Sequence, residues 1–306
     1  MTTDIDLPAT ATAVESSTAR RQPSVQRTLR SRGRMNSLVR HALLLAACAL
    51  MLYPVIWMVV SSLRSPDEIF TSPGLWVDEP HFENYTKGWN ALGQPFGHYL
   101  INSLIISIGA IMGNLVSCSL AAYAFARLRF RGRRPLFAVM LLTIMLPIHV
   151  IIIPQYVLFS SFGWVNTFLP LIVPKLLATD AFFIFLMVQF IRGIPHELDE
   201  AARIDGAGHP RIFLQIILPL MIPALATTTI FTFIWTWSDF FSQLIYLNSP
   251  DMYSVSVALR SFVDAQSNTS WGSVFAMNVV SLVPVFLIFL FGQRFLLQGI
   301  ATTGGK

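Results

Sequence analysis

The sequence predicts an all-α, polytopic membrane protein, and three observations support that prediction. Only 12% of the residues are charged, whereas 54% are hydrophobic and the mean hydropathy is +0.60. Soluble domains carry about 25% charged residues, so this composition is typical of a chain embedded in lipid. The apolar residues gather in long stretches, and arginines cluster between alternate stretches. These features leave no room for a large soluble domain.

Six stretches are apolar enough and long enough to cross a membrane. A helix needs about 20 residues to span the roughly 30 Å of hydrocarbon in a bilayer. The stretches cover residues 42–63, 99–126, 136–160, 168–191, 221–247 and 272–297. They form one predicted six-helix domain over residues 37–306. Residues 1–36 are rich in Thr, Ala, Ser and Arg without apolar periodicity, so we expect a disordered basic tail there.

The positive charges predict which side of the membrane each loop occupies, because lysine and arginine are enriched in cytoplasmic loops. Positive residues gather before the first stretch and after the second, fourth and sixth. Among them are Arg20, Arg21, Arg27, Arg30, Arg32, Arg34, Arg40, Arg127, Arg129, Arg131, Arg133, Arg134, Arg192, Arg203, Arg211, Arg294 and Lys306. Only Arg64, Lys87 and Arg260 fall in the other loops. We therefore expect a multi-pass protein of the cell (inner or plasma) membrane with both termini in the cytoplasm.

A polar segment at about 193–220 separates the fourth and fifth stretches and has the features of two short helices. Pro195 suits the first turn of a helix, and the acidic residues that follow it suit the positive end of the helix dipole. Gly206 has the backbone freedom that ends a helix. A second piece begins at Pro210 and carries apolar residues on one side. Because this loop is predicted to be cytoplasmic, it is placed to dock with a cytoplasmic partner.

The same segment resembles a known motif. It consists of Glu200-Ala201-Ala202, three residues, Gly206, nine residues, and then Ile216-x-Leu218-Pro219. This pattern is similar to that of the permease subunits of bacterial ABC importers, in which the loop docks into a groove on the ATPase subunit. Other segments resemble the carbohydrate importer permeases, in particular the smaller permease of the maltose importer. They include the run from Ala121 to Gly132, Asn102-Ser103, Pro147 and Pro154, and Trp235 to Asp239.

The resemblance covers roughly residues 45–306 and implies a six-helix fold of the ABC importer type I permease class. It implies one permease half of an ATP-driven importer that moves a mono- or oligosaccharide. The implied partners are a second, different permease, two ATP-binding cassette ATPase subunits and an extracytoplasmic substrate-binding protein, besides the sugar and the lipid bilayer. The chain itself would need no cofactor, because the ATPase subunits would bind ATP and Mg²⁺. The residues implied to couple to the ATPase are Glu200, Ala201, Ala202, Asp205, Gly206, Leu218 and Pro219.

Within that motif, the two alanines are small enough for the helix to lie close against the ATPase groove. Glu200 supplies a carboxylate that can accept hydrogen bonds, and Gly206 sets the bend between the two helices. Helix propensity alone would also explain alanines at these positions.

Charged residues inside the apolar stretches are candidates for the substrate path. A charge at the centre of a bilayer costs about 2.5–3.5 kcal/mol on insertion scales, so it normally faces a cavity or pairs with another charge. Lys175 and Asp180 are five positions apart, or about 140° around a helix, so we expect each to meet a different helix. Asp239 follows Trp235 and Trp237, and aromatic faces beside a carboxylate suit a sugar ring and its hydroxyls.

Gln155 and Asn102 are further candidates for the same path. His149 lies in the middle of the third stretch and is more typical of a packing residue. For all of these side chains, structural hydrogen bonding between helices is the alternative role.

Other function classes fit the residues less well. Cys48 and Cys118 both fall in apolar stretches, which is typical of small buried hydrophobes rather than of a metal site. The net charge of +5 belongs to loops that flank membrane helices and does not predict nucleic-acid binding. The tail at 304–306 is a near miss for a phosphate-binding loop and lacks the Ser or Thr after the lysine, so we expect no enzyme.

Two alternatives remain open. The importer could carry a glycerol-phosphate-type polyol, which extra arginines facing a cavity would favour. From a different class, the chain could be a secondary transporter or a membrane scaffold. A secondary transporter should show repeated halves with interrupted helices in matching positions, and a scaffold would not need the docking loop.

Overall fold

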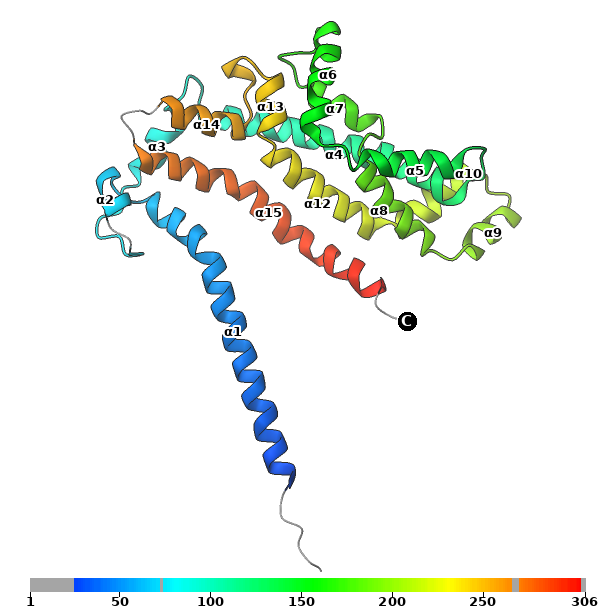
Figure 1. Ribbon diagram of the computed structural model, residues 1–306, viewed down its shortest axis with the longest axis horizontal. Coiled ribbons are helices and arrows are strands. Elements are labelled where there is room, and N and C mark those ends of the chain that lie inside the picture. Colours follow the sequence, from blue (N-terminus) through cyan, green and yellow to red (C-terminus); the bar gives the residue numbers. More distant parts are fainter. Residues whose placement is uncertain (1–24, 72–73, 266–269, 304–306) are drawn as a thin grey trace, which may run out of the picture. The chain divides into compact units, whose positions relative to one another are not determined.

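The computed structural model describes residues 25–71, 74–265 and 270–303, and all regular elements in these ranges are helices (Figure 1). The predicted all-α class is therefore confirmed. The chain divides into two compact units, Met1–Val55 and Ile56–Lys306. This boundary lies inside the first predicted span, whereas the sequence placed it after residue 36.

Helix α1 covers Val25–Ser61 and begins earlier than expected. The sequence predicted a disordered tail through residue 36, but residues 25–36 are helical. Extending an existing helix fixes fewer dihedral angles per hydrogen bond than starting one, so the apolar part of α1 can propagate into this polar segment. The rest of the predicted tail, residues 1–24, lies outside the described residues.

Within the described residues, four helices are suited to cross a membrane, or up to six if each strongly bent pair counts as one span, against the six predicted. Four single spans pass by length and composition: Ser37–Ser61 in α1, Phe96–Arg127, Leu169–Arg192 and Trp271–Phe295. Two strongly bent pairs complete the six. The first joins Arg133–Thr143 to Ile148–Ser161 at 101°, and the second joins His209–Leu220 to Ile222–Ser238 at 73°.

Spans three and four are each divided into two helices, and a residue with a restricted or unusual backbone conformation lies at each break. Span three consists of α5 (Arg133–Thr143) and α6 (Ile148–Ser161), and Pro147 precedes α6, where a helix loses nothing by its missing N–H. Span four consists of α7 (Leu169–Leu176) and α8 (Ala181–Arg192), which are separated by Ala178 at φ +56°. A left-handed residue ends the right-handed helical path.

The fifth predicted span, 221–247, ends earlier than the sequence indicated. Helix α12 covers Ile222–Ser238, the backbone of Asp239 is extended, and the short helix α13 (Phe241–Tyr246) follows. An aspartate favours such a position because its side chain can accept from a backbone N–H nearby. The Oδ1 atom of Asp239 accepts from the backbone N–H of Ser242 at 3.1 Å.

Helix α4 (Phe96–Arg127) contributes residues to all three hydrophobic clusters of the second unit. One end of α4 packs with α12, α14 (Val255–Ala265) and α15 (Trp271–Thr303). The other end packs with α8 and with the polar segment between α8 and α12. Figure 1 shows α14 and α9 (Glu197–Ile204) at opposite ends of this unit. The remaining short elements are α2 (Pro66–Thr71), α3 (Glu83–Trp89) and a 3₁₀ turn at Pro250–Met252.

Candidate functional site

The polar segment 193–220, here called the loop segment, forms the two short helices that the sequence predicted. Helix α9 covers Glu197–Ile204, and α10 covers His209–Ile212. A π-helical turn at Phe213–Ile217 and α11 (Leu218–Leu220) lead into α12. Gly206 lies between α9 and α10 at φ +80° with open space around it. The requirement for glycine there is conformational, because a side chain would find room but would strain the backbone.

One face of the loop segment packs against the helices. Ala202, Ile212, Phe213 and Ile217 are all buried in the cluster that α4 and α8 contribute to. The Phe213 ring lies 5.2 Å from the ring of Tyr123 on α4, measured between centroids. This apolar face fixes the orientation of α9 and α10 relative to α4 and α8.

A buried ion pair fixes the same face. The Nε atom of Arg127, in the last turn of α4, lies 3.0 Å from Oδ2 of Asp199 on α9, and the two side chains are only 1% and 5% exposed. Arg127 also donates to the carbonyl of Ile194 at 2.7 Å, and its Nη1 lies 2.9 Å from Nε2 of His196. One guanidinium thus contacts three positions of the loop segment.

A second contact joins α4 to the start of α10. The Tyr123 hydroxyl lies 3.3 Å from Nδ1 of His209, and it also contacts the His209 carbonyl at 3.4 Å. Tyr123 and Arg127 are four residues apart, so they lie on one face of α4. The loop segment is therefore fastened to a single helix at two points, one for each of its two helices.

The other face of the loop segment is bare. Glu200, Ala201, Asp205 and Gly206 are exposed, and so is Pro219, while Leu218 is half-buried. Ile204 is 87% exposed although it is apolar. Its exposure leaves the Ile204 side chain accessible to a partner, next to the Gly206 turn.

This geometry corrects one expectation from the sequence. The motif implied that Ala201 and Ala202 both lie against a partner, but Ala202 is 9% exposed and packs in the cluster with α4 and α8. Asp199 and Ala202 are three residues apart and share the inner face of α9. Only Ala201 lies on the exposed face.

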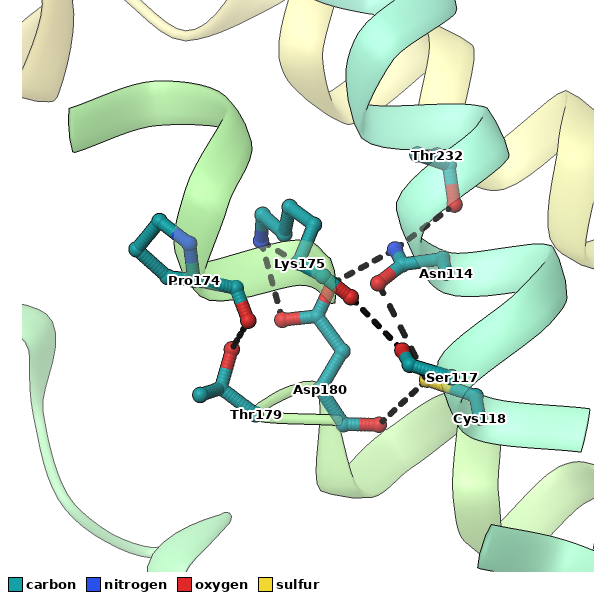
Figure 2. A network of polar contacts seen from close by, with 8 residues as sticks. All are labelled: Asn114, Ser117, Cys118, Pro174, Lys175, Thr179, Asp180 and Thr232. Atoms are coloured by element: carbon teal, nitrogen blue, oxygen red, sulfur yellow. Dashed lines mark hydrogen bonds and ion pairs between the residues drawn. The ribbon is translucent and has the colours of Figure 1, made fainter. Parts of the chain in front are cut away.

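A polar network lies where span four is interrupted (Figure 2). The Lys175 Nζ atom is 2.9 Å from both carboxylate oxygens of Asp180. The prediction that these two residues lie on separate faces was wrong, because it assumed a continuous helix. The left-handed Ala178 between them turns the chain back, so that the two side chains face each other.

Helices α4 and α12 complete this network. Asn114 donates to Oδ2 of Asp180 at 2.7 Å and to the hydroxyl of Thr232 at 3.1 Å. Ser117 donates to the carbonyl of Lys175 at 2.6 Å, which satisfies one of the backbone groups left free by the break (Figure 2). The network joins spans two, four and five at one point.

Glycine permits the close approach of α4 to the break. A Cβ atom on Gly113 would lie 2.9 Å from the backbone carbonyl carbon of Lys175 and 3.0 Å from the nitrogen of Leu176. These are backbone atoms, which cannot move aside as a side chain can. Gly113 therefore sets the distance at which Asn114 and Ser117 reach the network.

A cavity of about 190 Å³ opens beside the network. Its wall consists of Thr143, Ile144, Thr179, Asp180, Ala181, Phe182 and Trp235. Trp235 is 48% exposed, and its ring packs against the rings of Phe182 and Phe183. An aromatic face, two threonine hydroxyls and a carboxylate therefore surround one space, and these groups suit a polyhydroxylated ring.

Two of the candidate path residues in span five do not join this cavity. Trp237 is 5% exposed and donates from its indole N–H to the carbonyl of Ser281 on α15 at 3.1 Å. Asp239 lies beyond the end of α12 and holds the backbone of Ser242. Because Trp235 and Trp237 point to different sides of α12, the aromatic cluster predicted around Asp239 does not form.

The remaining candidates hold loops and neighbouring helices. Asn102 donates at 2.9 Å to the carbonyls of both Asp251 and Tyr253. Gln155 accepts from the hydroxyl of Tyr246 at 3.5 Å, and the ring of His149 lies 4.9 Å from that of Phe241. In the part of the chain that the structure describes, no three His, Cys, Asp or Glu side chains gather as a metal site would require.

Comparison with known proteins agrees with this architecture. The family described as "Binding-protein-dependent transport system inner membrane component" matches residues 113–302. The chain is 33% identical over 84% of its length to the diacetylchitobiose uptake system permease protein NgcG of Streptomyces coelicolor, and the match covers 84% of that protein. It is 30% identical over 85% of its length to the sn-glycerol-3-phosphate transport system permease protein UgpE of Yersinia pestis, with 94% of that protein covered.

A solved structure has the same fold. It belongs to a bacterial ABC transporter involved in the import of the acidic polysaccharide alginate. The TM-score is 0.76 at 24% sequence identity, and the match covers 86% of this chain and 97% of that chain. The predicted importer permease fold is confirmed.

Proposed function

We propose that this chain, which belongs to the family of inner membrane components of binding-protein-dependent transport systems, is one permease half of an ATP-driven sugar importer. Its partners would be a second permease, two ATPase subunits that bind ATP and Mg²⁺, and an extracytoplasmic binding protein. The chain itself would bind no nucleotide and catalyse no covalent reaction. Both termini would lie in the cytoplasm, as the arginine distribution indicates.

The observation that carries this proposal is the two-faced loop segment. Its inner face is held by Arg127 and Tyr123, and its outer face presents Glu200, Ala201 and Ile204 without cover. A membrane scaffold would need no such lever. A helix pair that is firmly attached on one side and bare on the other can transmit the movement of a partner to the helix that holds it.

Helix α4 provides a direct route from the loop segment to the interrupted span. Arg127 and Asn114 are 13 residues apart on this continuous helix, or about 20 Å at 1.5 Å per residue. A displacement of the loop segment would move Tyr123 and Arg127, and with them Asn114 and the network at Lys175 and Asp180. Closure of the ATPase subunits around ATP would thereby reshape the centre of the permease.

The cavity favours a neutral sugar over a phosphorylated polyol. Neither lysine nor arginine is among the seven residues that line it, and Asp180 is the one charged residue of that wall. Lys175 and Asp180 neutralise each other as an ion pair, so no net positive charge faces the cavity. A phosphate would therefore find no uncompensated cation there, whereas sugar hydroxyls can donate to the Asp180 carboxylate and a sugar face can stack on Trp235.

An uptake experiment tests the proposal. Cells that depend on this permease would be given radiolabelled mono- and oligosaccharides and sn-glycerol 3-phosphate. The wild-type protein should import at least one sugar and not glycerol phosphate. Gly206→Asp should abolish this import while the protein stays in the membrane, because aspartate strains the φ +80° turn. Unimpaired sugar import in Gly206→Asp would overturn the coupling role of the loop segment.

A further inference from the structure

A cluster of arginines surrounds a cavity that the proposed transport mechanism does not use. The cavity has a volume of about 620 Å³, which is within the range of about 300–1,000 Å³ for ligand sites. Its wall consists of Arg129, Phe130, Gly132, Arg133, Arg134, Pro135, Phe137 and Arg192. It lies where α4 turns into α5, next to the end of α8.

Four positive charges converge on this cavity without a carboxylate in its wall. Arg129, Arg133 and Arg134 come from the turn between α4 and α5, and Arg192 comes from the last turn of α8. Among the described residues, the ion pairs with carboxylates involve other cations, and none of these four takes part in one. Mutual repulsion of four guanidinium groups is unfavourable unless an anion lies between them.

The helix dipole adds to the positive potential. Arg133 and Arg134 occupy the first turn of α5, which contains no acidic residue. The N-terminus of a helix already carries a partial positive charge, so arginines there are unfavourable and an anion is favoured. Arg133 donates to the carbonyl of Leu128, and Arg192 lies 5.4 Å above the ring of Phe137. These contacts hold two of the guanidinium groups at the cavity.

The surroundings of the cavity indicate that the anion is attached to a hydrocarbon chain. Leu136, Val139 and Leu142 lie three residues apart on α5, and they are 54%, 58% and 60% exposed. They form one apolar stripe that begins at the arginine cavity and continues into the membrane-crossing part of the chain. A phospholipid could place its phosphate among the arginines and its acyl chain along this stripe.

We propose that this cavity binds the headgroup of an anionic phospholipid at the cytoplasmic surface of the membrane. Arg129, Arg134 and Arg192 would donate to the phosphate, and Phe130 and Phe137 would cover the glycerol region. Basic pockets between membrane helices on the cytoplasmic side bind such headgroups by this chemistry. The site is separate from the loop segment's bare face and from the cavity at Asp180.

The test uses the full-length chain in nanodiscs of phosphatidylcholine that contain phosphatidylglycerol. After gentle extraction, native mass spectrometry counts the phosphatidylglycerol molecules that stay bound to each chain. The variant Arg129→Gln/Arg134→Gln/Arg192→Gln removes three charges from the cavity. Arg131→Gln is the matched control, because it removes an exposed charge from the same loop but does not line the cavity.

The wild-type protein and Arg131→Gln should retain phosphatidylglycerol, and the triple variant should retain it about tenfold less. Retention of phosphatidylcholine should not differ among the three proteins. Equal retention of phosphatidylglycerol by the triple variant would overturn the proposal. So would an equal loss in Arg131→Gln, which would mean that loop charge alone attracts the lipid.

Two further arms complete the test. Inorganic phosphate added before extraction should not displace the lipid, and efficient displacement would show that the site takes a free anion instead. If the triple variant is not recovered folded, Arg134→Gln alone is used, because Arg134 is exposed. That single change should lower retention by about threefold, and unchanged retention would contradict the lipid site.

Discussion

The loop segment and the interrupted span four are both polar interruptions of an apolar chain, but they are satisfied in different ways. At the break, Lys175 and Asp180 pair with each other, and Asn114 adds a third partner from within the same chain. In the loop segment, Asp199 is paired with Arg127, whereas Glu200 and Asp205 on the other face remain exposed. The charged groups at the break are thus paired within the chain, whereas those of the loop segment are paired on one face and exposed on the other.

This difference separates polar groups that are compensated within the chain from polar groups that are left exposed by it. A charge inside a membrane helix must be compensated within the protein, because lipid offers no hydrogen bonds. The network at the break meets that requirement without any other molecule. Under the proposed function, the outer face of the loop segment lies in water and stays exposed until an ATPase covers it. The polar groups of the break hold three spans together, and those of the loop segment would transmit force.

The largest loss of stability is expected from removing the Arg127 charge, which holds the loop segment against α4. Arg127→Ala would leave Asp199 buried and unpaired, and breaking a buried pair costs about 3–5 kcal/mol. The loop segment should then detach locally, so trypsin should cleave after the exposed Arg203 much faster than in the wild type. Limited proteolysis of the purified protein measures this rate.

Two variants show whether the ion pair itself is responsible. Arg131→Ala removes an exposed arginine of the same turn and should leave the cleavage rate unchanged. Arg127→Met/Asp199→Leu replaces both charges with apolar groups and should restore much of the protection. A cleavage rate in Arg127→Ala equal to that of the wild type would refute the anchor.

A smaller effect is expected at the break in span four. Lys175→Met removes the ammonium group from Asp180, which keeps only Asn114 as a side-chain donor. The two side chains are 31% and 23% exposed, so the loss should be about 2 kcal/mol rather than that of a fully buried pair. Unfolding in detergent should show this loss. The variant Lys175→Met/Asp180→Asn should recover part of it, and equal losses in both variants would contradict the pairing.

A still smaller loss of stability is expected from a substitution at Gly113, where α4 lies close to the backbone of the break in span four. Gly113→Ala places a methyl group 2.9 Å from the backbone of Lys175, and overpacking of this kind costs about 1–3 kcal/mol. The better helix propensity of alanine offsets about 1 kcal/mol of this cost. Gly109→Ala is the comparison, because the nearest atoms to its new methyl group belong to the side chain of Ile172, at 2.7–3.0 Å, rather than to the backbone. If both variants unfold at the same temperature, the backbone contact at Gly113 is not limiting.

Hydropathy was enough to predict the helical class and the apolar stretches that could cross a membrane, since both depend on length and composition. It does not register the bend at 144–147, where Pro147 precedes α6. It could not predict the break at Ala178 either, because the backbone there packs against Gly113 of α4. Alanine carries no signal for a left-handed backbone. The prediction that Lys175 and Asp180 lie apart was therefore wrong, because it assumed a regular helix between them.

The anchor at Arg127 was also missed, although its sequence signal was present. Arg127 ends an apolar run, as many positive residues at the ends of membrane helices do, so it resembled the other arginines. Three carboxylates lie in the first turns of α9, and only Asp199 shares the inner face with Ala202. A comparison of helix faces could have singled out Asp199, but its partner lies 72 positions earlier and could be found only in the folded chain.

Docking of an ATPase on the bare face of the loop segment is tested most directly by Ile204→Asp. Ile204 is 87% exposed, so this change should alter the free energy of unfolding by no more than about 0.5 kcal/mol. The measurement is the amount of ATPase that co-purifies with the permease when both are expressed together. Leu75→Asp, a change at an exposed apolar residue in the loop before α3, is the control. The ATPase should be lost from Ile204→Asp and retained by Leu75→Asp. Full retention by a folded Ile204→Asp protein would contradict docking of the ATPase on this face.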